Sequence, residues 1–291
     1  MAQSQPRPEM GFAAAAKSFQ GHLEGTGKAL HTIASYKLDL KRFEEFLSEA
    51  FPKGMGAGVF NKMTPKTLEY FEKALLARGL KTNSRRRILL TVQKFMRYLG
   101  SRKKAPPELL KKMGAPERVQ RIPKTVDWEK LYASLMAMPA STPLEARNRA
   151  ILLTLLESGC QVHELSLLKR EDVQGAQLQF RGKRARTFGL SKNLAKVLAG
   201  LCQMCEADPK SARSAWLFLG HNRYGALGGA VSPRGVELLL KVEGARQGFP
   251  KLTARMIRNS TMKYWITQEV PHAEIKARMG LRGDHGLRMW S

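Results

Sequence analysis

The sequence predicts a mainly α-helical protein of two domains, with a small β-hairpin or sheet edge in the second domain. Three observations predict this class. Apolar residues recur at three- and four-residue steps along most of the 291-residue chain, which is the spacing of amphipathic helices. One stretch, 177–190, instead alternates apolar and polar residues like a pair of strands. Residues 100–124 are rich in Pro, Lys and Arg and separate the two halves.

The first half is predicted to hold about four short helices with basic outer faces. Residues 1–16 are expected to be a loose leader, and an apolar stripe over 13–50 predicts helix. Thr64-Pro65 predicts the start of another helix, because Pro is favoured in the first helical turn. In the last helix, 84–99, apolar residues alternate with Arg and Lys. We expect one helical domain over 17–104.

The second domain is expected at 125–291, after a linker at 105–124. Its first strong pattern is an apolar helix over 147–158. The alternation at 177–190 flanks Gly182-Lys183, which predicts a hairpin turn there. Helical patterns then return at 191–206, 232–247, 253–268 and 271–279. This half is therefore predicted to be a mixed α/β domain.

Charge is the strongest signal in the composition. The chain has 50 Lys and Arg against 24 Asp and Glu, a net charge of +26, with 43% hydrophobic residues. This balance indicates a folded protein whose surface attracts a polyanion, and a merely basic soluble protein is the alternative. No run of apolar residues is as long as the about 18 residues that a membrane-spanning helix needs. The first residues also lack the charged-then-apolar order of a signal peptide. We expect no membrane association and a cytoplasmic, nucleoid-associated protein.

The cysteines do not predict a metal site. Cys202 and Cys205 form a C-x-x-C pair, and Cys160 stands apart from them. A zinc site would need a fourth ligand at a matching spacing, and the pair falls in an apolar helical stretch. We expect these residues to be packed in a core, with no metal and no organic cofactor.

Short segments in both halves follow one another in an order that is specific when they are taken together. In the first half they are Thr32–Tyr36, Leu80–Ser84 and Phe95–Leu99. In the second half they are Arg121–Lys124, Arg147–Leu153, Glu164-Leu165, Trp216–Leu219 and Ser232–Val236. The set resembles the tyrosine recombinase (phage integrase, Xer-type) family. The resemblance implies a helical core-binding domain and a catalytic-like domain that together clamp duplex DNA.

Active members of that family cut DNA by attack of a tyrosine hydroxyl on the scissile phosphate, and the resemblance implies where their pocket residues would lie. The six matching positions hold, in chain order, Gln161, Lys183, Arg255, Arg258, Leu281 and Trp290. The family has Arg, Lys, His, Arg, His and Tyr there, so only the second and the fourth position keep its residue. Gln lacks the guanidinium fork, Leu has no donor and Trp is no nucleophile. We therefore expect a pocket that stays basic but has lost catalysis.

Nearby residues offer no obvious replacement for the lost groups. His163 is expected on a helix surface and Tyr264 in a core, and an unactivated Ser291 would be a poor nucleophile. Family members usually continue past the tyrosine into a helix that docks on a neighbouring protomer. Since this sequence stops one residue after Trp290, we expect no cyclic assembly by that route.

Double-stranded DNA is the expected partner, held through its phosphates by basic residues. The expected contacts are Lys81, Arg85, Arg86, Arg87, Lys94, Lys183, Arg184, Arg186, Arg255 and Arg258. Two alternatives stay open for the pocket residues. The basic hairpin can serve as a simple phosphate-gripping turn, and Arg255 and Arg258 can be solvated helix-face charges.

Three hypotheses about function follow. The first is a non-catalytic DNA-binding protein with an accessory, regulatory or architectural role, either self-associated on DNA or beside an active tyrosine recombinase. The second is an active site-specific recombinase whose partner supplies the tyrosine in trans. The third is a protein–protein adaptor that no longer binds DNA, which the charge disfavours. RNA is a weaker partner because no aromatic platform motif is present.

Overall fold

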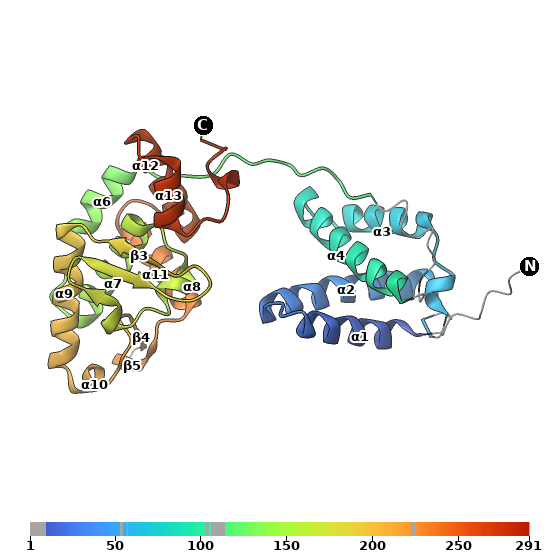
Figure 1. The fold of residues 1–291 in the computed structure, drawn as a ribbon, viewed down its shortest axis with the longest axis horizontal. Coiled ribbons are helices and arrows are strands. Elements are labelled where there is room, and N and C mark those ends of the chain that lie inside the picture. Colours follow the sequence, from blue (N-terminus) through green and yellow to red (C-terminus); the bar gives the residue numbers. More distant parts are fainter. Residues whose placement is uncertain are drawn as a thin grey trace, which may run out of the picture. The chain divides into compact units, whose positions relative to one another are not determined.

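The structure, a computed structural model, describes residues 10–52, 55–56, 58–102, 105, 114–222 and 225–290. The chain divides into two units, residues 1–121 and 122–291, each with its own hydrophobic core (Figure 1). Unit 1 is helical in its described part, and unit 2 adds two small antiparallel sheets to its helices. The predicted fold class, mainly α with a small sheet in the second domain, is confirmed.

Unit 1 is built from α1 (Phe12–Gly25), α2 (Leu30–Ala50), α3 (Pro65–Ala77) and α4 (Thr82–Ser101), with a short 3-10 turn η1 (Val59–Asn61). Aromatic side chains from all of these helices meet in the core, where Phe12, Phe43 and Phe95 are at most 1% exposed. The rings of Phe12 and Phe95 meet edge to face, 5.6 Å apart. Such contacts add to the burial energy of the rings.

Two predictions for the start of the chain were wrong. The expected single helix over 13–50 is two helices, because Gly27 adopts a left-handed backbone (φ 68°) that ends the first of them. The predicted leader, 1–16, reaches too far, because α1 begins at Phe12, and the Phe12 and Ala15 side chains are buried in the core. The earlier part of the leader, 1–9, lies outside the described residues.

In the described end of the predicted linker, residues 114–121 belong to unit 1, and α4 holds part of this stretch. Gln93 donates to the carbonyl of Gly114 (3.0 Å), and Asn83 pairs with both backbone groups of Val119 (2.9 and 3.0 Å). We call residues 114–119 the strap. Within the predicted linker 105–124, polar side chains of α4 therefore satisfy backbone groups of these residues.

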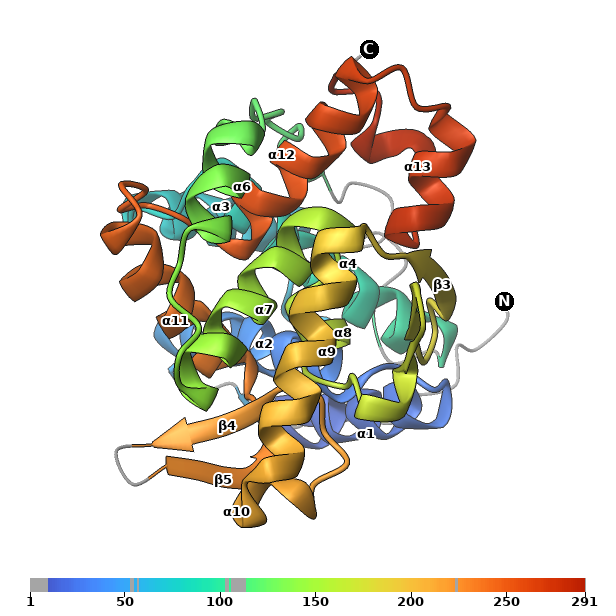
Figure 2. The same ribbon diagram turned by 90° about the vertical axis from the view of Figure 1, so that its left-hand side faces the viewer.

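Unit 2 contains α6 (Trp128–Met136), α7 (Pro143–Ser158), α8 (Val162–Leu165), α9 (Lys192–Ala207), α10 (Pro209–Ala212), α11 (Pro233–Arg246), α12 (Ala254–Thr267) and α13 (His272–Met279). Two 3-10 turns, η2 (Arg170–Asp172) and η3 (Asp284–Gly286), complete its helical elements. Helix α7 lies at the centre, with α6, α9 and α12 packed against it (Figure 2). Residues from Ala150 to Ser158 of α7 are all buried, so the second half of this helix is enclosed around its whole circumference.

The strands of unit 2 form two separate sheets. The first has the order β1 (Val173–Gln174), β2 (Gln177–Phe180) and β3 (Arg186–Gly189), all antiparallel. Its β2–β3 hairpin confirms the predicted turn at Gly182-Lys183, and Leu178 pairs with Phe188. The second, β4 (Leu219–Asn222) with β5 (Gly225–Ala230), was not predicted. Its glycine-rich sequence carries little of the alternation that marks a strand.

The cysteines lie where the sequence analysis expected them. Cys160 and Cys205 are buried and Cys202 is half-buried, the latter two on α9. In the part of the chain that the structure describes, no His, Cys, Asp and Glu side chains cluster as a metal site would require. None of the described helices is long and apolar enough to cross a membrane.

Candidate nucleic-acid interface and the predicted pocket

The predicted pocket forms where α7 ends. Gly159 takes a left-handed backbone (φ 57°) after α7, and the chain then turns into α8. Gln161 precedes α8, and its backbone N–H donates to the carboxylate of Glu164 (2.7 Å). This is a capping-box arrangement, and it fixes both residues at the start of the helix. The Gln161 side chain is half-buried.

Glu164 is held in a buried ion pair with Arg186 of β3. The two Arg186 terminal nitrogens lie 2.7 and 3.3 Å from the two carboxylate oxygens, and the side chains are only 7% and 4% exposed. Arg186 also donates through Nε to the carbonyl of Arg278 (2.7 Å), and its guanidinium stacks on Phe180. Arg186 was expected to bind phosphate, and in the structure a protein carboxylate occupies its fork.

Arg258 of α12 joins the ends of two other helices. Its guanidinium donates to the carbonyl of Gly159, after α7, and to that of Met279, at the end of α13 (3.0 Å for the latter). The residue is half-buried, and burial lowers the pKa of Arg258. Two of its N–H groups thus donate to carbonyls at helix ends, which have no hydrogen-bond partner within their own helices. Arg258 is therefore more than a solvated helix-face charge.

The electrostatics of this site come from groups on α8, β3 and α12 and in the turn before α8. For Glu164, burial alone raises the pKa, but the hydrogen bonds from Arg186 and Gln161 and the charges of Arg186 and Arg258 together lower it. For the neighbouring Cys160, burial raises the pKa to about 11. The Cys160 thiol is therefore protonated at neutral pH, which makes it a poor nucleophile.

The other predicted pocket residues lie in two kinds of surroundings. Lys183 and Arg255 are exposed, and within the described part of the chain neither has an ion-pair partner. Leu281 and Trp290 are half-buried and pack against the core of unit 2. The structure brings the end of α13 against β3, since a Cβ atom on Gly280 would lie 3.0 Å from Arg186.

The basic residues predicted on and around α4 also differ in their surroundings. Lys81 is exposed, and Lys94 lies over the ring of Tyr36, 5.4 Å from its centre. Each of the three consecutive arginines has an acceptor within unit 1. Arg85 donates to the carbonyl of Leu80, Arg86 to that of Pro116, and Arg87 to the Asp39 carboxylate. The last of these side chains is half exposed (49%).

Two residues of this region were missed as members of the site. Glu164 carried a signal, because it lies three residues after Gln161 at the capping-box spacing. Arg147 lies within the central apolar helix and donates to the carbonyl of Leu219 (2.9 Å). Burial lowers the pKa of Arg147 to about 10. Its position just before the apolar run that begins at Ala150 was its only sequence signal.

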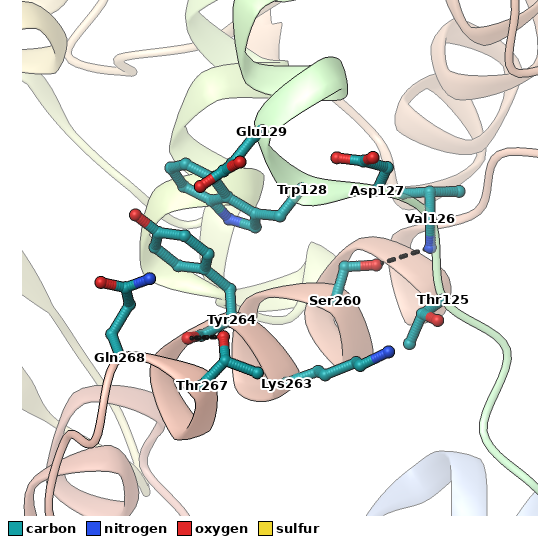
Figure 3. Close-up of a pocket in the computed structure, with 10 residues that line it drawn as sticks. All are labelled: Thr125, Val126, Asp127, Trp128, Glu129, Ser260, Lys263, Tyr264, Thr267 and Gln268. Carbon is teal, nitrogen blue, oxygen red and sulfur yellow. Dashed lines mark hydrogen bonds between the residues drawn. The ribbon is translucent and has the colours of Figure 1, made fainter.

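A separate pocket of about 470 Å³ lies between the start of α6 and the exposed side of α12 (Figure 3). Its wall is the stacked pair Trp128 and Tyr264, whose rings are 4.0 Å apart and nearly parallel. At its rim the Ser260 hydroxyl accepts from the backbone N–H of Val126 (2.8 Å), which ties down the entry into unit 2. None of the six predicted pocket positions lines it. Tyr264 packs against the core, as expected.

Comparison with known proteins agrees with this description. The model of the phage integrase N-terminal SAM-like domain matches residues 16–103. Tyrosine recombinase XerD of Listeria monocytogenes serotype 4b (strain F2365) is 26% identical over 248 residues, 80% of this chain and 78% of that protein. Tyrosine recombinase XerC of Pelobacter propionicus is 32% identical over 174 residues, 57% of this chain and 55% of that protein.

Two solved structures share the fold. One is XerH site-specific recombinase bound to palindromic difH substrate in a post-cleavage complex, with a TM-score of 0.75 and 18% identity over 93% of this chain and 80% of that one. The other is a lambda integrase dimer bound to a COC′ core site, with a TM-score of 0.71 and 13% identity over 98% and 78% of the two chains. Residues 16–103 thus match the phage integrase N-terminal SAM-like domain, and most of the chain is similar in sequence to Xer tyrosine recombinases and in fold to solved recombinases.

Proposed function

We propose that the protein binds double-stranded DNA without cutting it, as a family member that has lost its catalytic machinery. The observation that carries this proposal is the state of the pocket. Four of its six positions no longer hold the family's residue, and the guanidinium groups of Arg186 and Arg258 donate to protein acceptors.

Double-stranded DNA is proposed as the partner because of the net positive charge of the protein and its similarity to recombinases. The net charge of +26 creates a field that attracts a polyanion, and the XerH and lambda integrase structures similar to this one are complexes with DNA. Lys183 and Arg255 are exposed and have no ion-pair partner among the described residues, so they are available for phosphate contacts. Contacts of this kind position a protein on DNA and make its affinity strongly dependent on salt.

The proposed loss of catalysis follows from what strand cleavage requires. An in-line hydroxyl must attack, cationic forks must hold the non-bridging oxygens, and a proton must reach the leaving oxygen. The Trp290 side chain has no hydroxyl that could attack, and the Gln161 side chain has no guanidinium fork. The Leu281 side chain cannot donate a proton to the leaving oxygen. Loss of a single transition-state donor typically costs about a hundredfold or more in rate, and here three separate functions are missing.

The role that fits such a protein is an accessory, regulatory or architectural one on DNA in the cytoplasm, at the nucleoid. It would act by itself or beside an active tyrosine recombinase. The second candidate is a recombinase whose partner supplies the tyrosine in trans. The retained Lys183 and Arg258 favour that candidate, since both match the family's pattern.

The test is a pair of assays on one labelled duplex library. Mobility shifts at two salt concentrations should show that the affinity for DNA falls steeply as salt rises. The slope of log affinity against log salt concentration should be smaller by about 1 for each phosphate contact that a substitution removes. Lys183→Gln and Arg255→Gln should each reduce the slope, and Lys66→Gln on α3 serves as the control. Suicide substrates should give no denaturation-resistant adduct, with or without an added active tyrosine recombinase.

Three results would overturn the proposal. An adduct formed by the protein alone would reveal a nucleophile elsewhere in the chain. An adduct on this chain's DNA site that needs the added recombinase would favour the shared active site. Weak binding that salt does not affect would remove DNA as the partner.

A further inference from the structure

Asp39 is a fully buried carboxylate at the contact between α2 and α4, which pack against each other in unit 1 (Figure 1). Its side chain is 0% exposed. Burial of a charged carboxylate is unfavourable unless the charge is paired and its oxygens accept hydrogen bonds. The partners of Asp39 therefore say what this carboxylate does.

Three side chains donate to it. One oxygen accepts from the guanidinium of Arg87 and from the hydroxyl of Thr91 (3.0 Å), both on α4. The other oxygen lies 3.5 Å from Arg42, one turn further along α2, at the outer limit of a hydrogen bond. Asp39 thus anchors the guanidinium of Arg87 by one edge.

The rest of the Arg87 side chain faces solvent. It is 49% exposed, and among the described residues Asp39 is its only acceptor. Its two neighbours differ, because Arg85 and Arg86 donate to uncharged backbone carbonyls and are half-buried. Of the three consecutive arginines, Arg87 alone combines a charged anchor with an exposed fork.

Such an arrangement suits recognition of a base better than attraction to a phosphate. The carboxylate offsets part of the guanidinium charge, so Arg87 adds less to the salt-dependent attraction than a free arginine does. At the same time its donors are fixed in direction, so little side-chain entropy is lost when they bind. A fixed guanidinium fork matches the O6 and N7 acceptors of guanine in the major groove.

We propose that Arg87 reads a guanine in the DNA site and that Asp39 is the positioning residue that aims it. This inference rests on the proposed DNA-binding function. It assigns sequence recognition to one side chain of α4, while the free basic residues supply the affinity that is common to all sequences.

The experiment begins with selection of preferred duplexes from a randomised library by the wild-type full-length chain. Each guanine of the selected site is then replaced, and binding is compared for wild type, Arg87→Ala, Arg87→Lys and Asp39→Asn. Arg97→Gln is the matched control, because Arg97 is exposed on the same helix and has no partner among the described residues. Melting temperatures show whether each variant is folded.

The wild type should prefer guanine at one position by about ten- to a hundredfold. Arg87→Ala should abolish that preference and leave the base preferences at the other positions of the site unchanged. Arg87→Lys should abolish it too, although the positive charge and hence the salt slope stay the same. Asp39→Asn alone should weaken the guanine preference. The double variant Asp39→Asn with Arg87→Ala should have the same lack of preference as Arg87→Ala alone. Arg97→Gln should retain the guanine preference.

Several outcomes would overturn the inference while the proposed function stands. If Arg87→Lys keeps the guanine preference, the fork is not what reads the base. If Arg87→Ala weakens all duplexes equally and reduces the salt slope, Arg87 contacts a phosphate. If Asp39→Asn is folded and leaves the preference intact, Asp39 positions nothing. Failure of the wild type to bind any duplex would instead contradict the proposed function itself.

Discussion

At the scale of single residues, the pair of Glu164 and Arg186 governs the pocket. Two charges that are removed from water are stable only when each satisfies the other. Arg186 achieves this with a two-pronged contact and a further hydrogen bond to a backbone carbonyl. The same contacts remove its fork from any external anion. One acidic residue thus decides that a basic residue of the hairpin is structural.

Glu164→Gln should strongly destabilise unit 2. Arg186 would keep its charge in a buried site without a carboxylate, and the loss of one partner of a buried pair typically costs about 3–5 kcal/mol. The measurement is urea unfolding followed by tryptophan fluorescence. Glu274→Ala is the control, since the pair of Glu274 and Arg278 is exposed on α13 and should contribute about 0–1 kcal/mol. Equal effects of the two changes would contradict this account.

The same pair should make stability depend on acid. The folded pKa of Glu164 is below its ordinary value of 4.5. The stability that the carboxylate contributes is therefore fully present above that value and is lost as pH falls through the lower folded pKa. The difference in unfolding free energy between wild type and Glu164→Gln should shrink as pH falls below 4.5. A difference that stays constant from pH 7 to below 4 would show that the ionised carboxylate contributes nothing.

At the scale of elements, the ends of helices do most of the positioning. The left-handed residues Gly159 and Gly280 end α7 and α13, and Arg258 caps carbonyls at both ends. The strap extends this principle outside the helices, because side chains of α4 satisfy the backbone of residues 114–119. Polar groups at element ends therefore hold together parts that are distant in sequence.

Two glycine-to-alanine changes should have opposite effects. Gly159→Ala forces a side chain into a left-handed backbone, which costs about 1–2 kcal/mol, and its Cβ would lie 2.4 Å from the end of Met279. Gly200→Ala lies inside α9 with no atom within 4 Å of the added Cβ, and it should stabilise by up to about 1 kcal/mol. Thermal melting of both variants is the test. A lower melting temperature for Gly200→Ala would contradict the assignment of α9.

Asn83→Ala should release the strap. The change removes both hydrogen bonds to Val119, and each such bond typically contributes about 1 kcal/mol. Limited trypsin digestion should then cut within 114–124 severalfold faster, with the melting temperature little changed. Asn193→Ala, which removes a hydrogen bond to Tyr132 in unit 2, is the control and should leave this cleavage rate alone. An unchanged rate in Asn83→Ala would mean that the strap is held by other contacts.

At the scale of the whole molecule, two separate cores predict two separate unfolding transitions. All four tryptophans, at 128, 216, 265 and 290, lie in unit 2. Tryptophan fluorescence should therefore follow only unit 2, whereas circular dichroism in the far ultraviolet follows the helices of both units. The two probes should give transitions that do not coincide in urea. Glu164→Gln should shift the fluorescence transition and only one of the two dichroism steps, and a single coincident transition would show that the units unfold together.

Much of the fold was determined by the sequence by itself. Most helices other than α6, the β2–β3 hairpin and the helix start at Thr64-Pro65 were predicted, because they depend on local periodicity and turn residues. The break at Gly27 and the glycine-rich β4–β5 hairpin were missed. The helical pattern in the sequence continues past the break at Gly27, and the glycine-rich β4–β5 sequence carries little of the alternation that marks a strand.

Which charges are free was decided only by the tertiary structure. Arg186 and Lys183 are equally basic in the sequence, yet Arg186 meets Glu164, 22 residues away, and Lys183 meets no acid among the described residues. Arg87 is anchored by Asp39, 48 residues away on another helix. Sequence reveals the number of charges and their spacing along the chain. Their pairing depends on contacts between distant segments and on burial, because only a carboxylate brought close in a region shielded from water can hold a guanidinium in place.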